Sequence, residues 1–573
     1  SGNLVARTTV APTESSFVEA RAFDAKGALT SLTSKQVSSF VGGEATVTVG
    51  AGAVVGGQKD GVTVSGGDVT AQAQVGKATV TNAGAVRGNV SATSSATTTT
   101  TVNSFKSETL ASPAAVRTTN SSVVTRDVAG STASLANATT GNIAGNVFVS
   151  GDAGAALTNA GTIGRPNTGQ TTTVNSRRFV DVLNQNDQIA TKAADGLSSS
   201  FDNSSKNVNR VVGGAVALEN SATGVLSGNI SLNGAGDISI VNAGAVRGTT
   251  TATTSGATTE TTNSSVGTIV TTPGKAPVLD VTATSTKNAS STTITNTAGS
   301  IVGTYSGSNG SLNFAPIVDG SISQNAAKDS SVTVSGTVFG AVNSTAGNGV
   351  NQTSSTTELT ETRLDTAGTG TRTREATSQF KSTQVAGTSA VTVSGAVNDS
   401  TVSSASVQST GNNKASAAIS GRVEGNVGVS SNGVTTSTNA NQLSLSQQDT
   451  KGVTRTLSVA EGGQNSFSRT GGSASAELSG KALVLGSVNV NGNTDASAVV
   501  GSTAAIGSTT VTGNLTVTAG SGVDTTSSTS SKYTFDTKTS RGSSTTTTTS
   551  VSTPSAPAAV ASAKVDGRVT GTT

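Results

Sequence analysis

Serine is the nucleophile that this chain offers in abundance, but the sequence supplies no base to activate it. The 573 residues include no His and no Cys. Ser-His and Cys-His nucleophilic arrangements and the usual zinc sites are therefore excluded. A serine without such a base is a turn or surface residue. We expect no catalytic residue, no metal site and no cofactor.

One aspartate lies in a sequence with some likeness to a calcium-binding repeat. The stretch NGAGDISI from Asn233 places Asp237 as in the nonapeptide G-G-x-G-x-D-x-U-x. It lacks the first Gly pair and does not recur in tandem, so Asp237 has no partner in register to share an ion. An ordinary turn is the better interpretation. No Asp or Glu pair recurs at a spacing that faces a common substrate.

The charge of the chain gives no strong field. The net charge is +3 over the whole length, so we expect no nucleic-acid partner and no capture by an anionic membrane. No run of about 18 apolar residues exists, so we expect no membrane span. Arg87 and Arg247 lie beside a turn and are expected on the surface. The sequons at Asn89 and Asn120 are candidates for glycosylation if the source glycosylates.

Three recurring motifs indicate the secondary structure in which the residues named above lie. The first is Gly-Asn-apolar-x-apolar, which starts at 88, 145, 228, 425 and 513, with GSVNV at 486 as a relative. The second is VTVSG, at 62, 332 and 391. The third is TVTNAGAVRG from Thr79, with copies ALTNAGTIG from Ala156, SIVNAGAVRG from Ser239 and a looser ITNTAGSIVG from Ile294. Such self-similarity is typical of repeat architectures.

The block 228–248 contains three short strands with Asn and Gly at the breaks. Apolar residues alternate with polar or small ones, as a strand with one buried face requires. Each block of about 20 residues therefore predicts one coil of a parallel β-helix, with coils about 4.8 Å apart. The residues expected to point inward are Val80, Val86, Ile230, Leu232, Ile238, Ile240 and Val246.

Asn82 and Gly84 are expected to form the corner of a coil. Asn and Gly tolerate the positive φ that allows a sharp change of direction. A stacked Asn side chain can also hydrogen-bond to the coil above or below.

Long segments of another character separate the motif blocks. We expect them to leave the β-helix as excursions over about 93–140, 165–210, 249–290, 350–385, 432–475 and 521–562. β-Arms and flexible loops are both open alternatives, and 180–197 is a candidate short helix. TTTVNS occurs in two of them, at 99 and 171. Charge concentrates at Arg177, Arg178, Asp181, Asp187, Lys192 and Asp195, and at Glu358, Glu361, Arg363, Asp365, Arg372, Arg374 and Glu375.

Composition favours ordered β-structure over disorder. Charged residues are 12% and aromatic residues 2% of the chain, which argues against a conventional core. Disordered chains usually carry many prolines and a high net charge, whereas this chain has 8 prolines and alternating Val, Ile, Thr and Ala. We expect one continuous repetitive β-solenoid over 1–573, a segment of a longer chain. Both ends look like interrupted coils, which predicts end-to-end association.

The NAGxV and GNVxV coils resemble the passenger regions of bacterial autotransporters and of filamentous-haemagglutinin-like exoproteins. The resemblance covers about half of the chain. It implies a right-handed β-helix displayed on a bacterial cell surface as an adhesin, aggregation factor or matrix fibre. No outer-membrane barrel pattern and no amino-terminal secretion domain of these families is recognisable here.

The leading hypothesis is a non-enzymatic extracellular structural protein, a subunit of a bacterial surface filament, matrix fibre or sheath. It would associate with itself end to end and laterally through the excursions. The first alternative is an adhesin passenger that binds a cell-surface or glycan ligand. A carbohydrate-active β-helix and a phage fibre are further alternatives.

Overall fold

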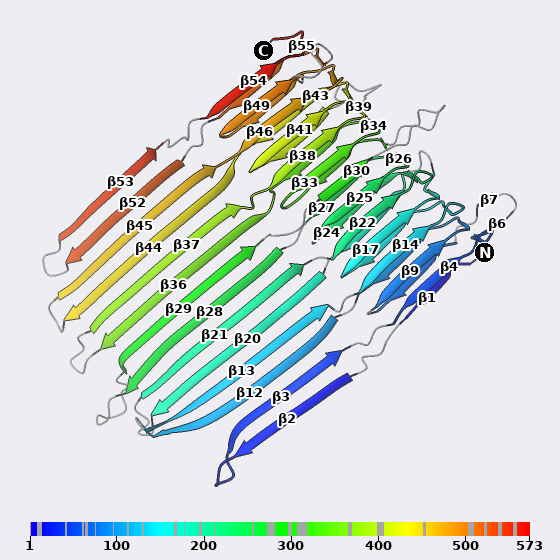
Figure 1. Cartoon of the computed structure of the whole chain (residues 1–573). Coiled ribbons are helices and arrows are strands. Elements are labelled where there is room, and N and C mark those ends of the chain that lie inside the picture. Colours follow the sequence, from blue (N-terminus) through cyan, green and yellow to red (C-terminus); the bar gives the residue numbers. More distant parts are fainter. Residues whose placement is uncertain are drawn as a thin grey trace.

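The computed structural model is an all-β chain in which four large sheets run the length of the molecule (Figure 1). Three sheets are parallel with 13 strands each, and the fourth is antiparallel with 14 strands. The structure describes residues 2–8, 14–39, 43–59, 62–63, 67–74, 76–95, 97–111, 114–128, 131–165, 169–176, 178–193, 198–212, 214–254, 257–271, 281–295, 301–305, 318–364, 370–397, 406–450, 454–501, 509–520, 524–536, 541–553 and 559–572. Within these ranges there is no helix, and so none that is long and apolar enough to cross a membrane.

The three parallel sheets are named sheets 1, 2 and 3 in the order in which the chain visits them. Sheet 1 contains β1 (Leu4–Arg7), β8 (Val69–Ala73), β11 (Val90–Ser94), β16 (Val147–Gly151), β19 (Thr171–Ser176), β24 (Asn229–Gly234), β27 (Thr250–Thr254), β32 (Ile322–Asn325), β35 (Val342–Ala346), β40 (Ser406–Gly411), β43 (Asn426–Ser431), β48 (Val488–Gly492) and β51 (Leu515–Ala519). Sheet 2 contains β4 (Ala45–Val49), β9 (Lys77–Asn82), β14 (Thr132–Asn137), β17 (Gly154–Asn159), β22 (Ala215–Asn220), β25 (Ile238–Asn242), β30 (Ile301–Tyr305), β33 (Ser330–Val334), β38 (Thr388–Val393), β41 (Lys414–Ile419), β46 (Ser473–Leu478), β49 (Asp495–Val500) and β54 (Val560–Val565). Sheet 3 contains β5 (Val54–Val55), β10 (Ala85–Val86), β15 (Asn142–Ile143), β18 (Thr162–Ile163), β23 (Val225–Ser227), β26 (Ala245–Arg247), β31 (Val318–Asp319), β34 (Thr337–Phe339), β39 (Ala396–Val397), β42 (Arg422–Val423), β47 (Leu483–Val484), β50 (Thr510–Val511) and β55 (Arg568–Val569).

The antiparallel sheet, named the side sheet, is built from long hairpins. Its strands are β2 (Glu14–Phe23), β3 (Leu29–Ser39), β12 (Thr97–Ala111), β13 (Ala114–Val128), β20 (Arg178–Ala193), β21 (Ser198–Val212), β28 (Ala257–Thr271), β29 (Val281–Thr295), β36 (Val350–Leu364), β37 (Gly370–Gln384), β44 (Val434–Thr450), β45 (Thr454–Thr470), β52 (Asp524–Asp536) and β53 (Arg541–Thr553). A separate short hairpin, β6 (Gln58–Lys59) and β7 (Val62–Thr63), lies between β5 and β8 in the chain.

One passage of the chain through sheets 1, 2 and 3 is called a coil here. Each return to sheet 1 adds a strand beside the previous one, so that β8, β11 and β16 are neighbours although hairpins and other strands separate them in sequence. The same holds in sheets 2 and 3. The strands of each parallel sheet therefore stand in the same order as the coils along the chain, because each coil pairs only with the coil before it and the coil after it.

In every second coil, a hairpin of the side sheet is inserted in the chain between the strand of sheet 1 and the strand of sheet 2. β11 leads into the hairpin β12–β13, whereas the next coil passes directly from β16 to β17. Strands in a sheet lie about 4.8 Å apart, so two coils rise by about 9.6 Å. A hairpin also spans two strand spacings. The alternation therefore lets consecutive hairpins pair with each other while the coils stay in contact (Figure 1).

The core lies between the parallel sheets and is made of small and branched aliphatic side chains. The seven residues expected to point inward, Val80, Val86, Ile230, Leu232, Ile238, Ile240 and Val246, are between 0% and 2% exposed, which confirms that prediction. Arg247 is exposed and Arg87 is half-buried, so neither enters the core. In the described residues the core cluster holds Ala, Val, Leu and Ile and no aromatic side chain.

Buried asparagines link successive coils at the end of sheet 2. The Nδ2 atom of Asn82 donates to Oδ1 of Asn137 at 2.8 Å, and Asn137 donates in turn to Asn159 at 2.8 Å. Asn159 and Asn220 continue the series to Asn242 at 2.8 and 2.7 Å. This ladder confirms the expected role of the Asn in the Asn-Ala-Gly motif. Hydrogen bonding is what makes a buried amide tolerable.

A second, outer series of asparagines explains the Gly-Asn motif. The Oδ1 atom of Asn89 accepts the backbone N–H of Asn146 at 2.9 Å, and Asn146 accepts that of Thr171 at 2.9 Å. Asn426 and Asn514 accept backbone N–H groups of later coils in the same way, at 2.8 and 2.9 Å. The motif thus satisfies a backbone donor at the corner that precedes sheet 1.

The glycine of the Asn-Ala-Gly motif has a different role from the one expected. Gly84 does not have a positive φ; instead, a Cβ atom there would overlap the carbonyl oxygens of Ala53 and Gly50 in the preceding coil. Its lack of a side chain allows close stacking. Positive φ occurs at the corner that precedes sheet 1, for example at Gly228 with φ of 96°, where only Gly adopts such a conformation without strain.

Replacing Asn159 by Ala is expected to weaken this part of the ladder. Asn159 is 0% exposed, and its loss leaves Oδ1 of Asn220 without its donor. Nδ2 of Asn137 loses its acceptor at 2.8 Å and keeps only the carbonyl oxygens of Gly141 and Thr162, each at 3.3 Å. A buried group left unpaired costs about 1–3 kcal/mol. Hydrogen exchange of the amides in β17 and β22 should accelerate accordingly. The control is Asn233→Ala, because exposed Asn233 bonds only to the side chains of Asn175 and Ser231; equal acceleration by both variants would contradict the ladder's importance.

Several local expectations from the sequence are wrong. The candidate helix at 180–197 is the strand β20 up to Ala193, paired on both sides with β13 and β21, and 194–197 lie outside the described residues. Pairing on two sides overrides weak helical preference. The stretch TTTVNS at 171 is β19 of sheet 1, where Val174 is buried, and only its copy at 99 belongs to a hairpin.

Two motif copies also differ in position from their relatives. The VTVSG copies at 332 and 391 lie in sheet 2, but Val62 belongs to the short hairpin β6–β7. The looser copy from Ile294 begins in the side sheet and reaches sheet 2 at Ile301, while 296–300 lie outside the described residues.

The excursion ranges can be compared directly with the hairpins. The hairpin strands that fall in or overlap the six ranges are β12–β13, β20–β21, β28–β29, β36–β37, β44–β45 and β52–β53. The hairpin β2–β3 was not expected. Its sequence, with Phe17, Glu19 and Arg21, lacks the Thr-rich character of the others.

Candidate interaction surface

The side sheet is a single layer, and its two faces differ in chemistry. Successive side chains of a strand point to opposite faces, and residues directly opposite each other share a face. We name the face that carries Phe105 the aromatic face and the other the charged face. The pairing register follows both faces from strand to strand across the sheet.

The aromatic face collects phenylalanines and side-chain amides. Phe105, Phe201, Phe380 and Phe467 all lie on it. The amides on this face include Gln36, Asn103, Asn120, Asn186, Gln188, Asn203, Asn207, Asn439, Asn441 and Asn465. None of these side chains is buried.

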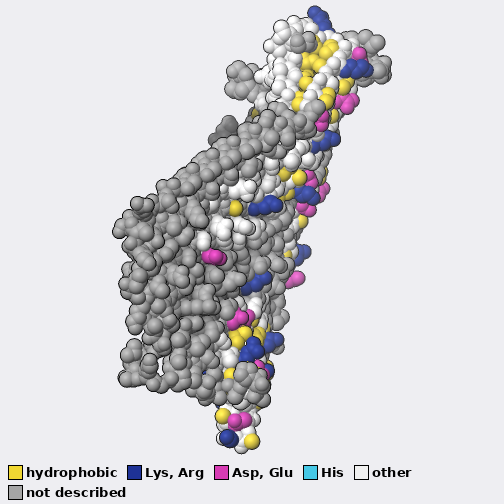
Figure 2. All heavy atoms as spheres, turned by 90° about the vertical axis from the view of Figure 1, so that its left-hand side faces the viewer, with side chains coloured by type: hydrophobic (Ala, Val, Ile, Leu, Met, Phe, Trp, Pro, Cys, Tyr) yellow, Lys and Arg dark blue, Asp and Glu magenta, His cyan; other side chains and the backbone are white. Residues whose placement is uncertain are grey.

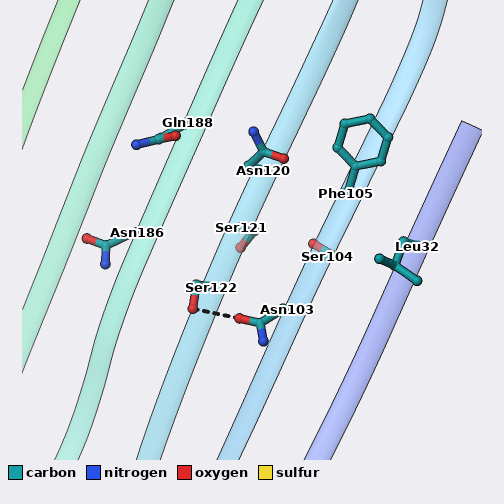
Figure 3. A pocket seen from close by; sticks show the side chains of 9 residues that line it. All are labelled: Leu32, Asn103, Ser104, Phe105, Asn120, Ser121, Ser122, Asn186 and Gln188. Atoms are coloured by element: carbon teal, nitrogen blue, oxygen red, sulfur yellow. Dashed lines mark hydrogen bonds between the residues drawn. The ribbon is translucent and has the colours of Figure 1, made fainter. Parts of the chain in front are cut away.

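Two adjacent rows of side chains on the aromatic face form a hollow of about 360 Å³ (Figure 3). In the first row Phe105 lies opposite Leu32 on one side and Asn120 on the other, and Asn120 lies opposite Gln188. This row therefore places one aromatic ring and two amides on three neighbouring strands.

The second row lies two residues away along the strands. It contains Asn103, Ser122 and Asn186 in register. The Ser122 hydroxyl donates to Oδ1 of Asn103 at 2.8 Å (Figure 3). Among the described residues, the side-chain amides of Asn120, Asn186 and Gln188 have no hydrogen-bond partner. Their donors and acceptors are available to a ligand.

A similar row recurs farther along the same face. Phe380 in β37 lies opposite Asn439 in β44, which lies opposite Asn465 in β45. Phe380 is 40% exposed. Nearby, the Arg469 guanidinium lies 5.5 Å from the centre of the Phe467 ring. The combination of one Phe and two amides on three successive strands therefore occurs twice.

The charged face carries most of the ionisable groups of the described side sheet. They are Lys35, Lys106, Glu108, Arg117, Asp187, Asp202, Lys206, Glu375 and Lys381. Lys106 binds Glu108 at 2.9 Å, and Arg117 lies opposite Glu108. The hydrogen bond and charge of Lys106, aided by Arg117, lower the pKa of the Glu108 carboxyl. Charges of both signs are also interspersed along the described surface in Figure 2.

The residues singled out from sequence do not gather into one site. Asp237 lies in the short connection between β24 and β25, and no cluster of three potential metal ligands occurs in the part of the chain that the structure describes. Asn89 belongs to the outer series of asparagines, in which its Oδ1 atom accepts the backbone N–H of Asn146. Asp187 and Lys192 lie on opposite faces of β20; Arg177, Asp195 and Asp365 lie outside the described residues.

The hollow was missed by sequence reasoning because its residues are far apart in the chain. Phe105, Asn120 and Gln188 become neighbours only through the pairing of three strands. Asn120 was noted only as a sequon. The detectable signal was weak: Phe is rare in this chain, with 12 residues, so a Phe inside a Thr-rich hairpin is notable.

In comparisons with protein-family models, curated proteins and solved structures, the chain matches none of them.

Proposed function

We propose that the chain is a right-handed parallel β-helix that acts as a non-enzymatic structural protein on the outside of a bacterial cell. The ordered return of the chain to sheets 1, 2 and 3 supports the helical path. The right hand is the expected one, because parallel strands joined by crossovers within a sheet are almost always connected in that sense.

The observation that carries a structural role is the unbroken repetition of the four sheets. Strand pairing continues through 13 strands in each parallel sheet and 14 in the side sheet. Stability in such a stack accumulates from contacts between neighbouring coils. The fold therefore extends in one dimension, as a filament, matrix fibre or sheath requires, and the side sheet widens it into a ribbon.

Exposed strands at both ends of the stack support self-association. Leu4 and Val5 in β1 are 41% and 57% exposed, and Val560 and Val565 in β54 are 55% and 41% exposed. Hydrophobic side chains also gather at the end that carries β54 (Figure 2). Uncovered strand edges recruit further strands. We propose that a strand of a second copy of this chain continues each sheet.

Purified chain is expected to form rods or ribbons that lengthen as its concentration rises. End-to-end contacts of this heterologous kind build filaments and not closed rings. Sedimentation velocity over a concentration series measures the association, and negative-stain microscopy of the same samples shows its direction. A monomer that persists at high concentration, with β1 and β54 still ordered, would contradict the proposed assembly.

An adhesin passenger is the second candidate function. The aromatic face favours it, because an exposed row of phenylalanine and amides on a rigid sheet is suited to a surface ligand.

A further inference from the structure

We propose that the aromatic face binds neutral glycan chains, in the hollow around Phe105 and again at the row of Phe380. The proposed filament is not a premise of this inference, because binding and assembly involve different surfaces: the side sheet for the first and the ends of the stack for the second.

The side chains of the hollow fit the chemistry of a sugar. A sugar ring presents hydroxyl groups at its rim and C–H groups on its face. Phe105 offers an apolar ring face next to Leu32, and aromatic surface is the usual apolar anchor of a recognition site. Each amide of Asn120, Asn186 and Gln188 can both donate to and accept from a hydroxyl group.

The distribution of charge favours a neutral ligand. The residues that line the hollow are amides, hydroxyls, Phe105 and Leu32, with no ionisable side chain. Lys106 and Glu108, which are close in sequence, point to the other face and pair with each other. On the aromatic face, the nearby Glu19 and Arg21 side chains also pair with each other. An anionic chain would therefore find no unpaired cation among the residues of the hollow.

The dimensions fit an oligosaccharide lying across the strands. Phe105 and Gln188 are two strand spacings apart, or about 9.6 Å, and the two rows are about 7 Å apart along the strands. An extended sugar chain can contact Phe105, Asn120 and Gln188 in succession, with the second row beside it.

The similar row that contains Phe380 allows one long polysaccharide to bind at two places on the side sheet. β12 and β37 are separated by seven strand spacings in the side sheet, or about 34 Å. Two weak sites on one rigid sheet gain affinity from each other when a single chain reaches both. A polymer should consequently bind more tightly than a short oligosaccharide.

A tryptophan reporter gives the most direct test, because the chain has no Trp of its own. In Phe105→Trp, the new indole keeps the aromatic surface and is the only indole that emits. Titration with laminarin, a neutral glucan, and with neutral mannan should shift or quench that emission for at least one of them, whereas anionic alginate should not. The matched control is Phe148→Trp. Phe148 is 41% exposed on the outer side of sheet 1, away from the hollow, and the emission of this variant should stay constant.

Affinity electrophoresis of the full chain measures how much the row of Phe105 and the row of Phe380 each contribute to polysaccharide binding. The polysaccharide that changes the emission of the Phe105→Trp variant should retard the native protein. Phe105→Ala and Phe380→Ala should each weaken that retardation by roughly tenfold, and Phe148→Ala should leave it unchanged. Circular dichroism checks that each variant keeps its strands.

Three results would overturn the proposal. They are no emission change with either neutral polysaccharide, equal changes at positions 105 and 148, and tighter binding of alginate than of the neutral chains. If Phe105→Ala reduces self-association in sedimentation and leaves carbohydrate binding intact, the aromatic face binds a second copy and the glycan assignment is wrong. Loss of filament formation alone would count against the proposed structural role and not against this site.

Discussion

Replacing Ile238 by Asp is expected to unfold the coils around β25. Ile238 is 1% exposed, and its backbone pairs with Val216 on one side and Ile301 on the other. The surrounding core is aliphatic, so the carboxylate finds no cation or hydrogen-bond donor to replace water. Burying an unpaired charge costs several kcal/mol. Because each coil depends on its neighbours, the loss should spread to β22 and β24.

Hydrogen exchange with peptide resolution measures this effect where a global unfolding curve cannot, since a long repeat array does not unfold in two states. The control is Ser239→Asp, one residue away and exposed on the outer side of the same strand. Ser239→Asp should leave protection in β22 and β25 nearly unchanged. Similar protection in the two variants would show that Ile238 does not point into the core.

Deleting residues 229–248 is expected to disrupt the side sheet although it spares the register of the coils. This segment is one coil without a hairpin, and the deletion joins Gly228 to Thr249, which lies next to Asn229 in the stack. The hairpins β20–β21 and β28–β29 then stand on adjacent coils. Their four strands need about 19 Å, whereas two coils provide about 10 Å. At least one hairpin must leave the sheet.

Deletion of residues 171–248 is the matched control. It removes a larger segment, one coil with a hairpin and one without, and so keeps the alternation. Limited trypsin digestion with mass-spectrometric mapping distinguishes the two. In the shorter deletion, cleavage should become rapid at Lys192 or Lys206 in β20–β21 or at Lys287 in β29, according to which hairpin leaves the sheet. The hairpins that remain in the longer deletion should stay resistant. Equal resistance of the two variants would mean that the spacing of hairpins and coils is not coupled.

Alternating patterns in the sequence were sufficient to predict the core. Ile230, Leu232, Ile238 and Ile240 could be assigned to the interior because period-two alternation defines which side of a strand is buried. The corner Asn82 could be predicted as well, since Asn bonds both to its own turn and to the next coil. These features depend on residues close together in the chain.

The pairing of hairpins could not be predicted from local pattern. The letters TTTVNS form a core strand at 171, where Val174 is buried, and a hairpin strand at 99, where Val102 is half-buried. Only the strand's neighbours distinguish the two. The strand β20 was open to a helical interpretation for the same reason, because few of the described side chains of a single-layer sheet are buried and the sequence then needs no clear alternation.

The candidate site depends even more on long-range register. Whether Phe105 faces the same side as Asn120 is decided by the pairing within one hairpin, and whether both face the same side as Gln188 by the pairing of two hairpins. A shift of one residue in either pairing would place the amides on the other face. No property of the individual residues reveals this.

The alternation of hairpin-bearing and hairpin-free coils has a consequence for how a gene of this kind can change length. Recombination between repeats that added or removed a single coil would encode two adjacent coils that both carry a hairpin, or two adjacent coils that both lack one. The product would then lose its continuous side sheet. An exchange that moved a whole pair, such as 171–248, would encode a protein that differs only in length. Inherited length variants should therefore differ by even numbers of coils, so that the heritable unit is twice the structural repeat.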